Sequence, residues 1–177
     1  MAAILALAGS NSSTSINYKL VQHTVSMVDN NDVQVMDMVR YPFPMYSEDE
    51  ERQNGFSNSL IELKNDIQAA NGLILSVNEH NGNPSAYFKN VLDWLSRLER
   101  KFLADTKVLL MSTSPGKRGG VGALGIVEQL LPRFGAEITA TFSLPSFHEN
   151  FGSDGIVDHE LKSSHQEALA TFLESLK

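Results

Sequence analysis

The sequence has 177 residues, of which 42% are hydrophobic and 20% charged, the composition of an ordinary globular protein that can bury a core in one domain. Its formal net charge of -7, with 14 lysines and arginines in total, argues against nucleic-acid binding, which needs a basic face. It has no cysteine, which excludes disulfides, thiolate catalysis and cysteine-ligated metals, and no stretch near the roughly 20 apolar residues of a membrane helix. We therefore expect a soluble, cytoplasmic protein with one domain over residues 1–177 and no nucleic-acid or membrane partner.

The first segment, residues 2–8, is an apolar run with the length of a buried parallel strand. Gly9 ends the run, and hydroxyl and amide side chains fill the positions before an amphipathic helix that begins at Ile16. The first N–H groups of a helix lack internal acceptors, and the helix dipole there favours negative charge, so this arrangement predicts a phosphate-binding turn. The alternative is a simple helix cap, but the polar run 10–15 is longer than a cap requires.

The remaining segments alternate between strands and helices. Further strands are predicted at 33–38, 72–77, 108–111 and 137–142. Helices are predicted at 57–70, 88–102, 121–131 and 158–176, the first of these with a capping box of Ser59 and Glu62. Residues 40–54 are predicted to be an irregular connection, with an aromatic contact surface at 41–46 and a solvated acidic run at 47–51. The alternation predicts an α/β three-layer sandwich with a five-stranded parallel sheet of order 2-1-3-4-5.

Three polar loops, at 9–17, 78–85 and 112–120, follow the first, third and fourth predicted strands and therefore meet where the strand order reverses, the usual ligand site of such sheets. A dinucleotide fingerprint is excluded because Gly9 is the lone glycine of the first loop, and a P-loop because Gly116-Lys117 is followed by arginine. A hydroxyl-lined turn without lysine suits one terminal phosphomonoester. FMN in a flavodoxin-like fold meets this description.

Three motifs occupy these loops. Gly-Ser-x-Arg-x-x-Ser-x-Asn is matched by Gly9, Ser10, Ser15 and Asn17, with Ser12 in place of arginine. Pro-Glu-Tyr-Asn followed by Leu-Lys-Asn-x-x-Asp-Trp is matched by Glu79, Asn81, Lys89, Asn90, Asp93 and Trp94, with Asn78 for proline and His80 for tyrosine. Ser-Pro-Gly-x-x-Gly-Gly is intact at 114–120. With these motifs the chain resembles the NADPH-dependent FMN reductases, a flavodoxin-like family that includes quinone, azo-dye and chromate reductases.

The resemblance implies an FMN site with three parts. The phosphate would be held by Ser10, Ser12, Ser15, Ile16 and Asn17, one edge of the isoalloxazine by Asn78, Glu79, His80 and Asn81, and the pyrimidine edge by Ser114, Pro115, Gly116, Lys117, Gly119 and Gly120. The two glycines would let the backbone lie close to a flat ring. The implied reaction passes a hydride from NADPH or NADH to FMN and then electrons to a small acceptor such as a flavin or quinone. It requires no metal, and we name no catalytic acid or base.

Two other functions stay open. One is a flavodoxin-type electron carrier without turnover. Such carriers have an acidic surface around the flavin, and the basic residues Lys117 and Arg118 argue against this function. The other is a sensor or binding protein that has lost FMN, which the missing arginine suggests. Instead of contacting a flavin, His80 could be a loop histidine whose ring forms hydrogen bonds with its own backbone.

The segment after the second loop carries further expectations. We interpret Lys89, Asn90 and Asp93 as structural, and Trp94 as a core or subunit-interface residue. Because segment 88–102 carries more apolar surface than one sheet face covers, we expect a homodimer or tetramer, with 41–46 as a further contact.

Overall fold

The computed structural model describes residues 3–29 and 31–177, so residue 2 of the first predicted strand lies outside the described part. A five-stranded sheet has the order β2-β1-β3-β6-β7, and every neighbouring pair of strands is parallel. Its strands are β1 (Ala3–Ala8), β2 (Asp32–Met36), β3 (Gly72–Val77), β6 (Lys107–Thr113) and β7 (Glu137–Leu144). Since these are the five predicted strands in chain order, the predicted order 2-1-3-4-5 and the flavodoxin-like α/β fold are confirmed.

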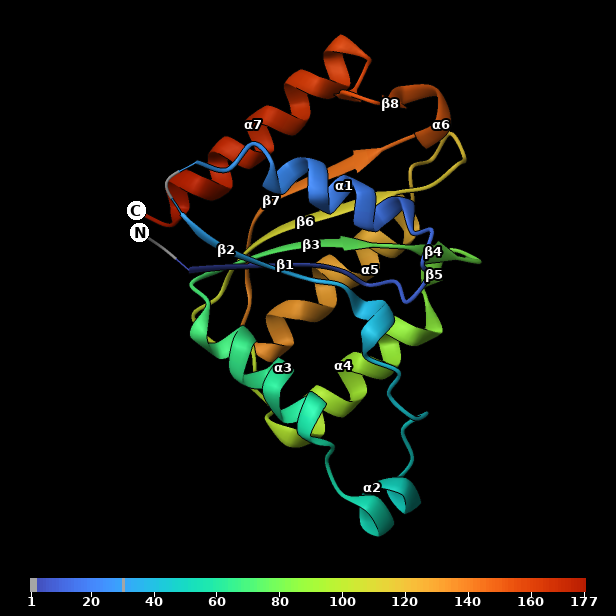
Figure 1. Cartoon of the computed structure of the whole chain (residues 1–177), viewed down its shortest axis with the longest axis vertical. Coiled ribbons are helices and arrows are strands. Elements are labelled where there is room, and N and C mark those ends of the chain that lie inside the picture. The colour runs from blue at the N-terminus through green and yellow to red at the C-terminus, as the bar shows by residue number, and fades with distance from the viewer. Residues whose placement is uncertain (1–2, 30) are drawn as a thin grey trace.

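Helices cover both faces of this sheet (Figure 1). One face carries α1 (Ile16–Val25) and α7 (His159–Ser175), and the other carries α3 (Asn58–Ala69), α4 (Ala86–Leu98) and α5 (Val121–Leu130). Successive side chains of β1 enter the two layers alternately: Leu5 and Leu7 pack with α3 and α4, whereas Ile4 and Ala6 pack with α1 and α7. The apolar run at the start of the chain is therefore buried on both sides.

The α1–α7 layer also buries a histidine. His165 has 0% of its surface exposed, and its Nε2 lies 2.8 Å from the Oγ1 of Thr24. The Thr24 hydroxyl donates its one proton to the Leu20 carbonyl at 2.8 Å, so Nε2 of His165 is the donor to Thr24. Its Nδ1 has no hydrogen-bond partner among the described residues. Burial lowers the pKa of His165 to about 4, with a further contribution from His23, so the ring is neutral at pH 7.

Several predicted boundaries were wrong. α3 is capped by Ser57, whose Oγ accepts from the Leu60 N–H, so the predicted box of Ser59 and Glu62 does not form. α4 ends at Leu98 instead of continuing to Phe102. Short elements that the sequence patterns did not predict are η1 (Met38–Arg40), α2 (Glu48–Asn54), β4 (Glu79–His80), β5 (Asn83–Pro84), η2 (Leu131–Phe134), α6 (Phe147–Asn150), β8 (Phe151–Gly152) and β9 (Gly155–Ile156).

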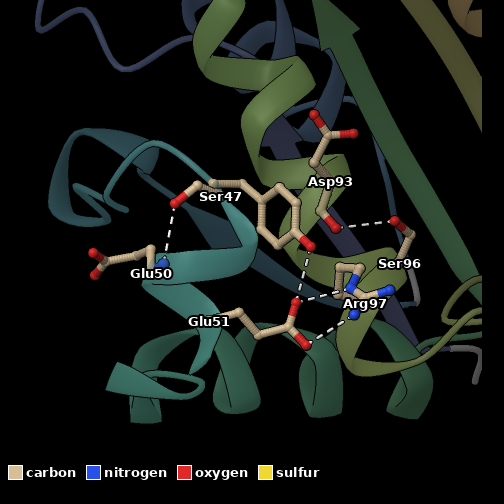
Figure 2. Close-up of polar contacts among 7 residues, drawn as sticks. Ser47, Glu50, Glu51, Asp93, Ser96 and Arg97 are labelled. Atoms are coloured by element: carbon tan, nitrogen blue, oxygen red, sulfur yellow. Dashed lines mark hydrogen bonds and ion pairs between the residues drawn. The ribbon is translucent and has the colours of Figure 1, made fainter. Parts of the chain in front are cut away.

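Residues 41–57, which we call the strap, leave the body of the fold and carry α2 (Figure 1). The helix forms in a predicted irregular segment because Ser47 caps it, accepting from the Glu50 N–H, and four acidic residues in its first turn complement the helix dipole. None of its side chains is buried, which agrees with a solvated acidic face except at Glu51. That carboxylate meets the guanidinium of Arg97 on α4 at 2.8 and 3.0 Å (Figure 2), and this contact lowers the pKa of Glu51.

Two side chains of α4 hold the strap against the body of the fold through hydrogen bonds. The Asn90 amide accepts from the Tyr46 N–H at 2.8 Å and donates to the Pro44 carbonyl at 2.9 Å, and the Trp94 indole donates to the same carbonyl at 2.8 Å. Asn90 and Trp94 are thus structural, as predicted, and Trp94 belongs to the core of this chain. Since Leu95 and Phe102 are also buried within the chain, the apolar surface on which the dimer was predicted is already covered.

Candidate functional site

The loop between β1 and α1 places hydrogen-bond donors at the carboxyl end of the sheet. Ser15 is the N-cap of α1, and its Oγ accepts from the Tyr18 N–H at 3.1 Å, so the hydroxyl proton remains available to another acceptor. The N–H groups of Ile16 and Asn17 open the helix and have no intrahelical acceptor. These groups together form the arrangement by which a helix N-terminus binds an anion.

The preceding residues order this loop through their own hydroxyl groups. The Ser10 Oγ accepts from the Ser12 N–H at 3.3 Å, and the Ser12 Oγ accepts from the Thr14 N–H at 3.3 Å. Ser12 and Thr14 hydroxyls are also 3.2 Å apart. Thr14 was not among the predicted site residues because it occupies a variable position of the motif. The ordered loop 9–17 carries no charged side chain, so the donors here are all neutral.

Asn17 has a different task from the one predicted for its side chain. It is 2% exposed, and its Oδ1 accepts from the Ser76 hydroxyl at 2.8 Å and from the Thr113 N–H at 3.1 Å. Its Nδ2 donates to the Thr113 carbonyl at 3.2 Å. The side chain therefore joins the start of α1 to the ends of β3 and β6, and it fixes the floor of the site. Its backbone N–H, in contrast, remains among the helix N-terminal donors.

The second predicted loop is a small hairpin of β4 and β5, and it is fastened to α5. The Glu79 Oε2 accepts from the Ala123 N–H at 2.9 Å, in the first turn of α5, where the N-cap Gly120 supplies no side-chain acceptor. A Cβ atom at Gly122 would lie 2.7 Å from the same oxygen, so glycine at this position makes room for the carboxylate. Glu79 therefore caps α5 and holds the hairpin beside the site.

Asn78 and His80 of the hairpin contact each other. The Asn78 Nδ2 lies 3.3 Å from the His80 Nε2, and the Asn78 Oδ1 is buried without a hydrogen-bond partner among the described residues. Exchanging the oxygen and nitrogen of the amide would only change which end faces the imidazole, so one end of the amide stays unpaired in either orientation. An unpaired buried amide end costs free energy unless a ligand or water meets it. The contact with Asn78 also replaces the predicted alternative in which His80 is satisfied by its own backbone.

The third loop, 114–120, is shaped by its last two glycines. Gly119 and Gly120 have φ angles of 60° and 80°, and a Cβ atom at Gly119 would lie 2.3 Å from the Ser143 Oγ. The Gly119 carbonyl accepts from the hydroxyls of Ser112 and Ser143 at 2.8 and 3.0 Å. The fold itself thus requires these glycines for a turn packed on β6 and β7, independently of any approach to a flat ring.

One pocket of about 260 Å³ brings the three loops together. Ten of the predicted residues line it: Ser10, Ser12, Ser15, Ile16, Asn17, Asn78, Glu79, His80, Ser114 and Pro115. Five predicted residues do not: Asn81, Gly116, Lys117, Gly119 and Gly120. Thr14 and Thr113 line it in addition. Thr113 stood in the predicted loop 112–120 but was not among the predicted site residues because the motif begins at Ser114; in the structure it is the last residue of β6.

Comparison of sequences gives one family and several relatives. The sequence model of the family described as NADPH-dependent FMN reductase matches residues 2–149. A quinone reductase of Escherichia coli K12 is 33% identical over 88 residues, which are 50% of this chain and 47% of that protein. The match thus spans about half the length of this relative. An NAD(P)H-dependent FMN reductase of Pseudomonas aeruginosa is 26% identical over 129 residues, covering 72% of this chain and 68% of that protein.

Solved structures resemble the fold over nearly its whole length. The NAD(P)H:acceptor oxidoreductase FerB of Paracoccus denitrificans has a TM-score of 0.80 and 20% identity, and the match covers 99% of this chain and 97% of that one. An NADH:FMN oxidoreductase, EMOB, in its apo form has a TM-score of 0.73 and 21% identity, with 100% and 91% covered. At these identities the likeness bears on the fold alone, and it agrees with the flavodoxin-like architecture.

Proposed function

The chain belongs to the NADPH-dependent FMN reductase family, as its motifs predicted, and on this premise we propose that it is an FMN-dependent oxidoreductase. It passes electrons from NADPH or NADH to a flavin, a quinone or a similar small acceptor. The quinone reductase of E. coli and the FMN reductase of P. aeruginosa support this class of reaction. Because the match with the quinone reductase spans 47% of that protein, the acceptor is part of the proposal.

The observation that best supports the proposal is that the pocket has one part suited to a phosphate and another suited to the edge of a flavin ring. The first part is the helix N-terminus with the Ser15 hydroxyl and the N–H groups of Ile16 and Asn17, which suit a phosphomonoester. The second part is the hairpin, where one end of the buried Asn78 amide is unpaired. A flavin ring carries both hydrogen-bond donors and acceptors along its edge, so it can meet either end of this amide. The residues present therefore fit FMN.

We assign the residues to roles as follows. The hydroxyls of Ser10, Ser12 and Ser15 and the opening N–H groups of α1 would hold the phosphate, and the Asn17 side chain holds the start of α1 against β3 below it. Residues 78–81 would lie along one edge of the ring and residues 114–120 along the pyrimidine edge; of these, Asn78, Glu79, His80, Ser114 and Pro115 line the pocket. Lys117, which is exposed, adds positive charge near the site. When bound, FMN supplies hydride transfer from the nicotinamide and electron delivery to the acceptor, and the protein supplies orientation and electrostatics.

The cofactor assignment is tested by titrating the apoprotein with FMN, FAD and riboflavin and following the quenching of flavin fluorescence. We expect FMN to bind more tightly than FAD, because the loop has donors for one terminal phosphate and no glycine-rich pyrophosphate fingerprint. Tighter binding of FAD would contradict this cofactor assignment. Steady-state oxidation of NADPH with an added quinone then separates an enzyme from an electron carrier, and the visible spectrum of freshly purified protein reveals a binding protein that has lost FMN.

The proposal also covers where the protein is located and how its subunits assemble. No helix within residues 3–29 and 31–177 is long and apolar enough to cross a membrane. The lack of cysteine supports a cytoplasmic location for one domain of 177 residues. We propose a homodimer or tetramer in which the strap is a contact, since its Met45 is 69% exposed and lies among the half-buried aromatic residues Tyr41, Phe43 and Tyr46. Light scattering that reports a monomer at micromolar concentration contradicts this assembly.

A further inference from the structure

Among the described residues, His80 and Glu79 are the two ionisable side chains that line the pocket, and His80 keeps one ring nitrogen directed away from its partner Asn78. The carboxylate oxygen of Glu79 is held by the Ala123 N–H of α5. His80 is exposed at the pocket, and its Nε2 is engaged by the side chain of Asn78. Its Nδ1 forms no hydrogen bond with a described residue. The imidazole is therefore oriented through one nitrogen and open to a ligand through the other.

The Asn78 amide can form a hydrogen bond with Nε2 of this ring whether or not Nε2 carries a proton. An unprotonated Nε2 accepts from the amide Nδ2. A protonated Nε2, present in the imidazolium and in the neutral ring left after Nδ1 gives up its proton, donates to the amide Oδ1 after rotation of the amide. In each state the other end of the amide faces away from the imidazole and still needs a partner. Asn78 thus holds the ring in one place while its charge changes, which a proline or alanine could not do.

Few charges surround the imidazole. On the hairpin the neighbouring charge is Glu79, and β5 (Asn83–Pro84) carries none. The part of α5 that packs on the hairpin begins with residues 121–125, all uncharged. The first loop has no charge, and the third loop contributes exposed Lys117 and Arg118. The imidazole therefore exchanges protons mainly with water and with whatever occupies the pocket.

We propose that His80 donates a proton to a quinone acceptor and that Asn78 is its positioning residue. The inference rests on the proposed function. Reduction of a quinone to a hydroquinone consumes one hydride, which originates from NADPH, and one proton. The N–H bond at Nδ1 of the imidazolium breaks and an O–H bond forms at the quinone oxygen. NADPH leaves as NADP⁺, and the neutral imidazole regains its proton from water.

The experiment compares two acceptors in wild type and His80→Gln. Benzoquinone requires a proton, whereas ferricyanide takes one electron and no proton. We expect His80→Gln to lower kcat with benzoquinone by about 10-fold, less than the roughly 10²–10⁴-fold of general acid–base catalysis because water reaches the site. The solvent deuterium isotope effect on this reaction should change as well. Because His80 also lines the proposed FMN pocket, both rates are measured at saturating FMN, and the ratio of the benzoquinone rate to the ferricyanide rate should fall by the same factor.

Asn78→Asp tests the positioning role with a readout that a structural role would not move. A carboxylate beside the imidazole favours its charged form, so the pH at which quinone reduction declines should rise by about 1 unit. NMR titration of the His80 ring in the apoprotein should show the same rise without any turnover.

The outcomes separate the two proposals. Equal losses with benzoquinone and ferricyanide in His80→Gln at saturating FMN overturn the proton-donor role while the proposed function stands. An unchanged pH profile and unchanged NMR titration in Asn78→Asp overturn the positioning role. If wild type neither binds FMN nor reduces ferricyanide with NADPH, the proposed function fails and this inference fails with it.

Discussion

Helices α1 and α4 each follow a loop of the candidate site, yet they bury different kinds of side chain. The buried residues of α1 are Asn17, Leu20, Val21 and Thr24, so half of them are polar. Those of α4 are Phe88, Asn90, Val91, Leu92, Trp94 and Leu95, with Asn90 as the one polar member. Apolar side chains therefore make up most of the buried face of α4, and the hydrogen bonds of its buried side chains are made to the strap, whereas hydrogen bonds hold α1 to the sheet and to α7 at defined atoms.

The difference follows from what each helix carries. α1 begins with the donors assigned to the phosphate, and its polar side chains tie it to β3 and β6 through Asn17 and to α7 through Thr24. α4 carries no such donors, and its polar residue Asn90 holds the strap instead. If its N–H groups are to point at a bound phosphate, α1 must keep a fixed orientation on the sheet. The hydrogen bonds of Asn17 and Thr24 provide this orientation. Four predictions test this contrast, beginning with the largest expected effect.

The first concerns the polar anchor of α1 on α7. Since burial lowers the pKa of His165 from 6.5 to about 4, the folded protein excludes a proton that the unfolded chain binds between these pH values. The free energy of unfolding should therefore fall as the pH falls below 6.5, by up to about 1.4 kcal/mol per pH unit and about 3 kcal/mol in total.

Urea unfolding at several pH values measures this effect. His165→Leu should have a flatter pH dependence than wild type in this range. The exposed His148 provides the control, because His148→Leu should leave the slope unchanged. Identical slopes in wild type and His165→Leu would show that His165 is not the titrating group.

The second prediction concerns the anchor of the strap on α4. Asn90→Ala removes two hydrogen bonds and leaves the Tyr46 N–H without its acceptor, while Trp94 still donates to the Pro44 carbonyl. We expect a loss of about 2 kcal/mol in the free energy of unfolding and no change in FMN affinity. Lys89→Ala, which breaks an exposed pair with Asp93, is the control and should cost about 0.5 kcal/mol or less. Weaker FMN binding in Asn90→Ala would show that α4 is not merely scaffold.

The third prediction compares two serines with the same capping role. Ser15 caps α1 and Ser47 caps α2, each accepting from the N–H three residues on. Replacement of either by alanine should cost about 1 kcal/mol in the free energy of unfolding. Only Ser15→Ala should also weaken FMN binding, by several-fold for a loss of about 1 kcal/mol, while riboflavin, which lacks the phosphate, binds as before. Equal FMN affinity in both variants would place the phosphate elsewhere.

The fourth prediction adds the charge that the first loop lacks. Ser12→Arg should bind FMN more tightly at low salt by about 1 kcal/mol, because a half-exposed guanidinium adds a charge-assisted hydrogen bond to the phosphate. The gain should shrink at high salt as the charges are screened. An unchanged affinity at low salt would mean that Lys19 or Lys117 already supplies the charge, or that the phosphate lies elsewhere. Ser15→Ala decides between these, since among the described residues the Ser15 hydroxyl contacts only the Tyr18 N–H at the start of α1, and its loss weakens FMN binding only if the phosphate lies in this loop.

The sheet could be predicted because its strands are continuous apolar runs, and the position of the pocket could be predicted because three polar loops follow neighbouring strands. Local chemistry also predicted a ligand site in loop 9–17, and residues of this loop line the pocket. The strap was only half predicted: its aromatic residues were noticed, but the helix α2 depends on a cap at Ser47 and on the distant partner Arg97. No periodicity in a segment of this length reports such partners.

The roles of individual site residues were harder to predict than their location. Asn17 and Glu79 are motif residues, and a motif says that a side chain is needed without saying what it contacts. In the structure both are engaged by backbone groups far along the chain, at Thr113 and Ala123 respectively. Gly119 was expected to admit a ring, whereas contact with Ser143 alone already requires glycine there. Such pairings depend on the three-dimensional arrangement and have no signal in the local sequence.

The three contacts of Asn17 have a consequence for the order in which the protein folds. They join positions 59 and 96 residues apart in the chain, so the loop cannot be closed before β1, β3 and β6 have assembled. Contacts of such long sequence separation form late, because their loop-closure entropy is recovered only once the intervening strands are in register. The binding loop should thus be among the last parts to order during refolding. The regain of FMN fluorescence quenching should then lag behind the regain of helical circular dichroism.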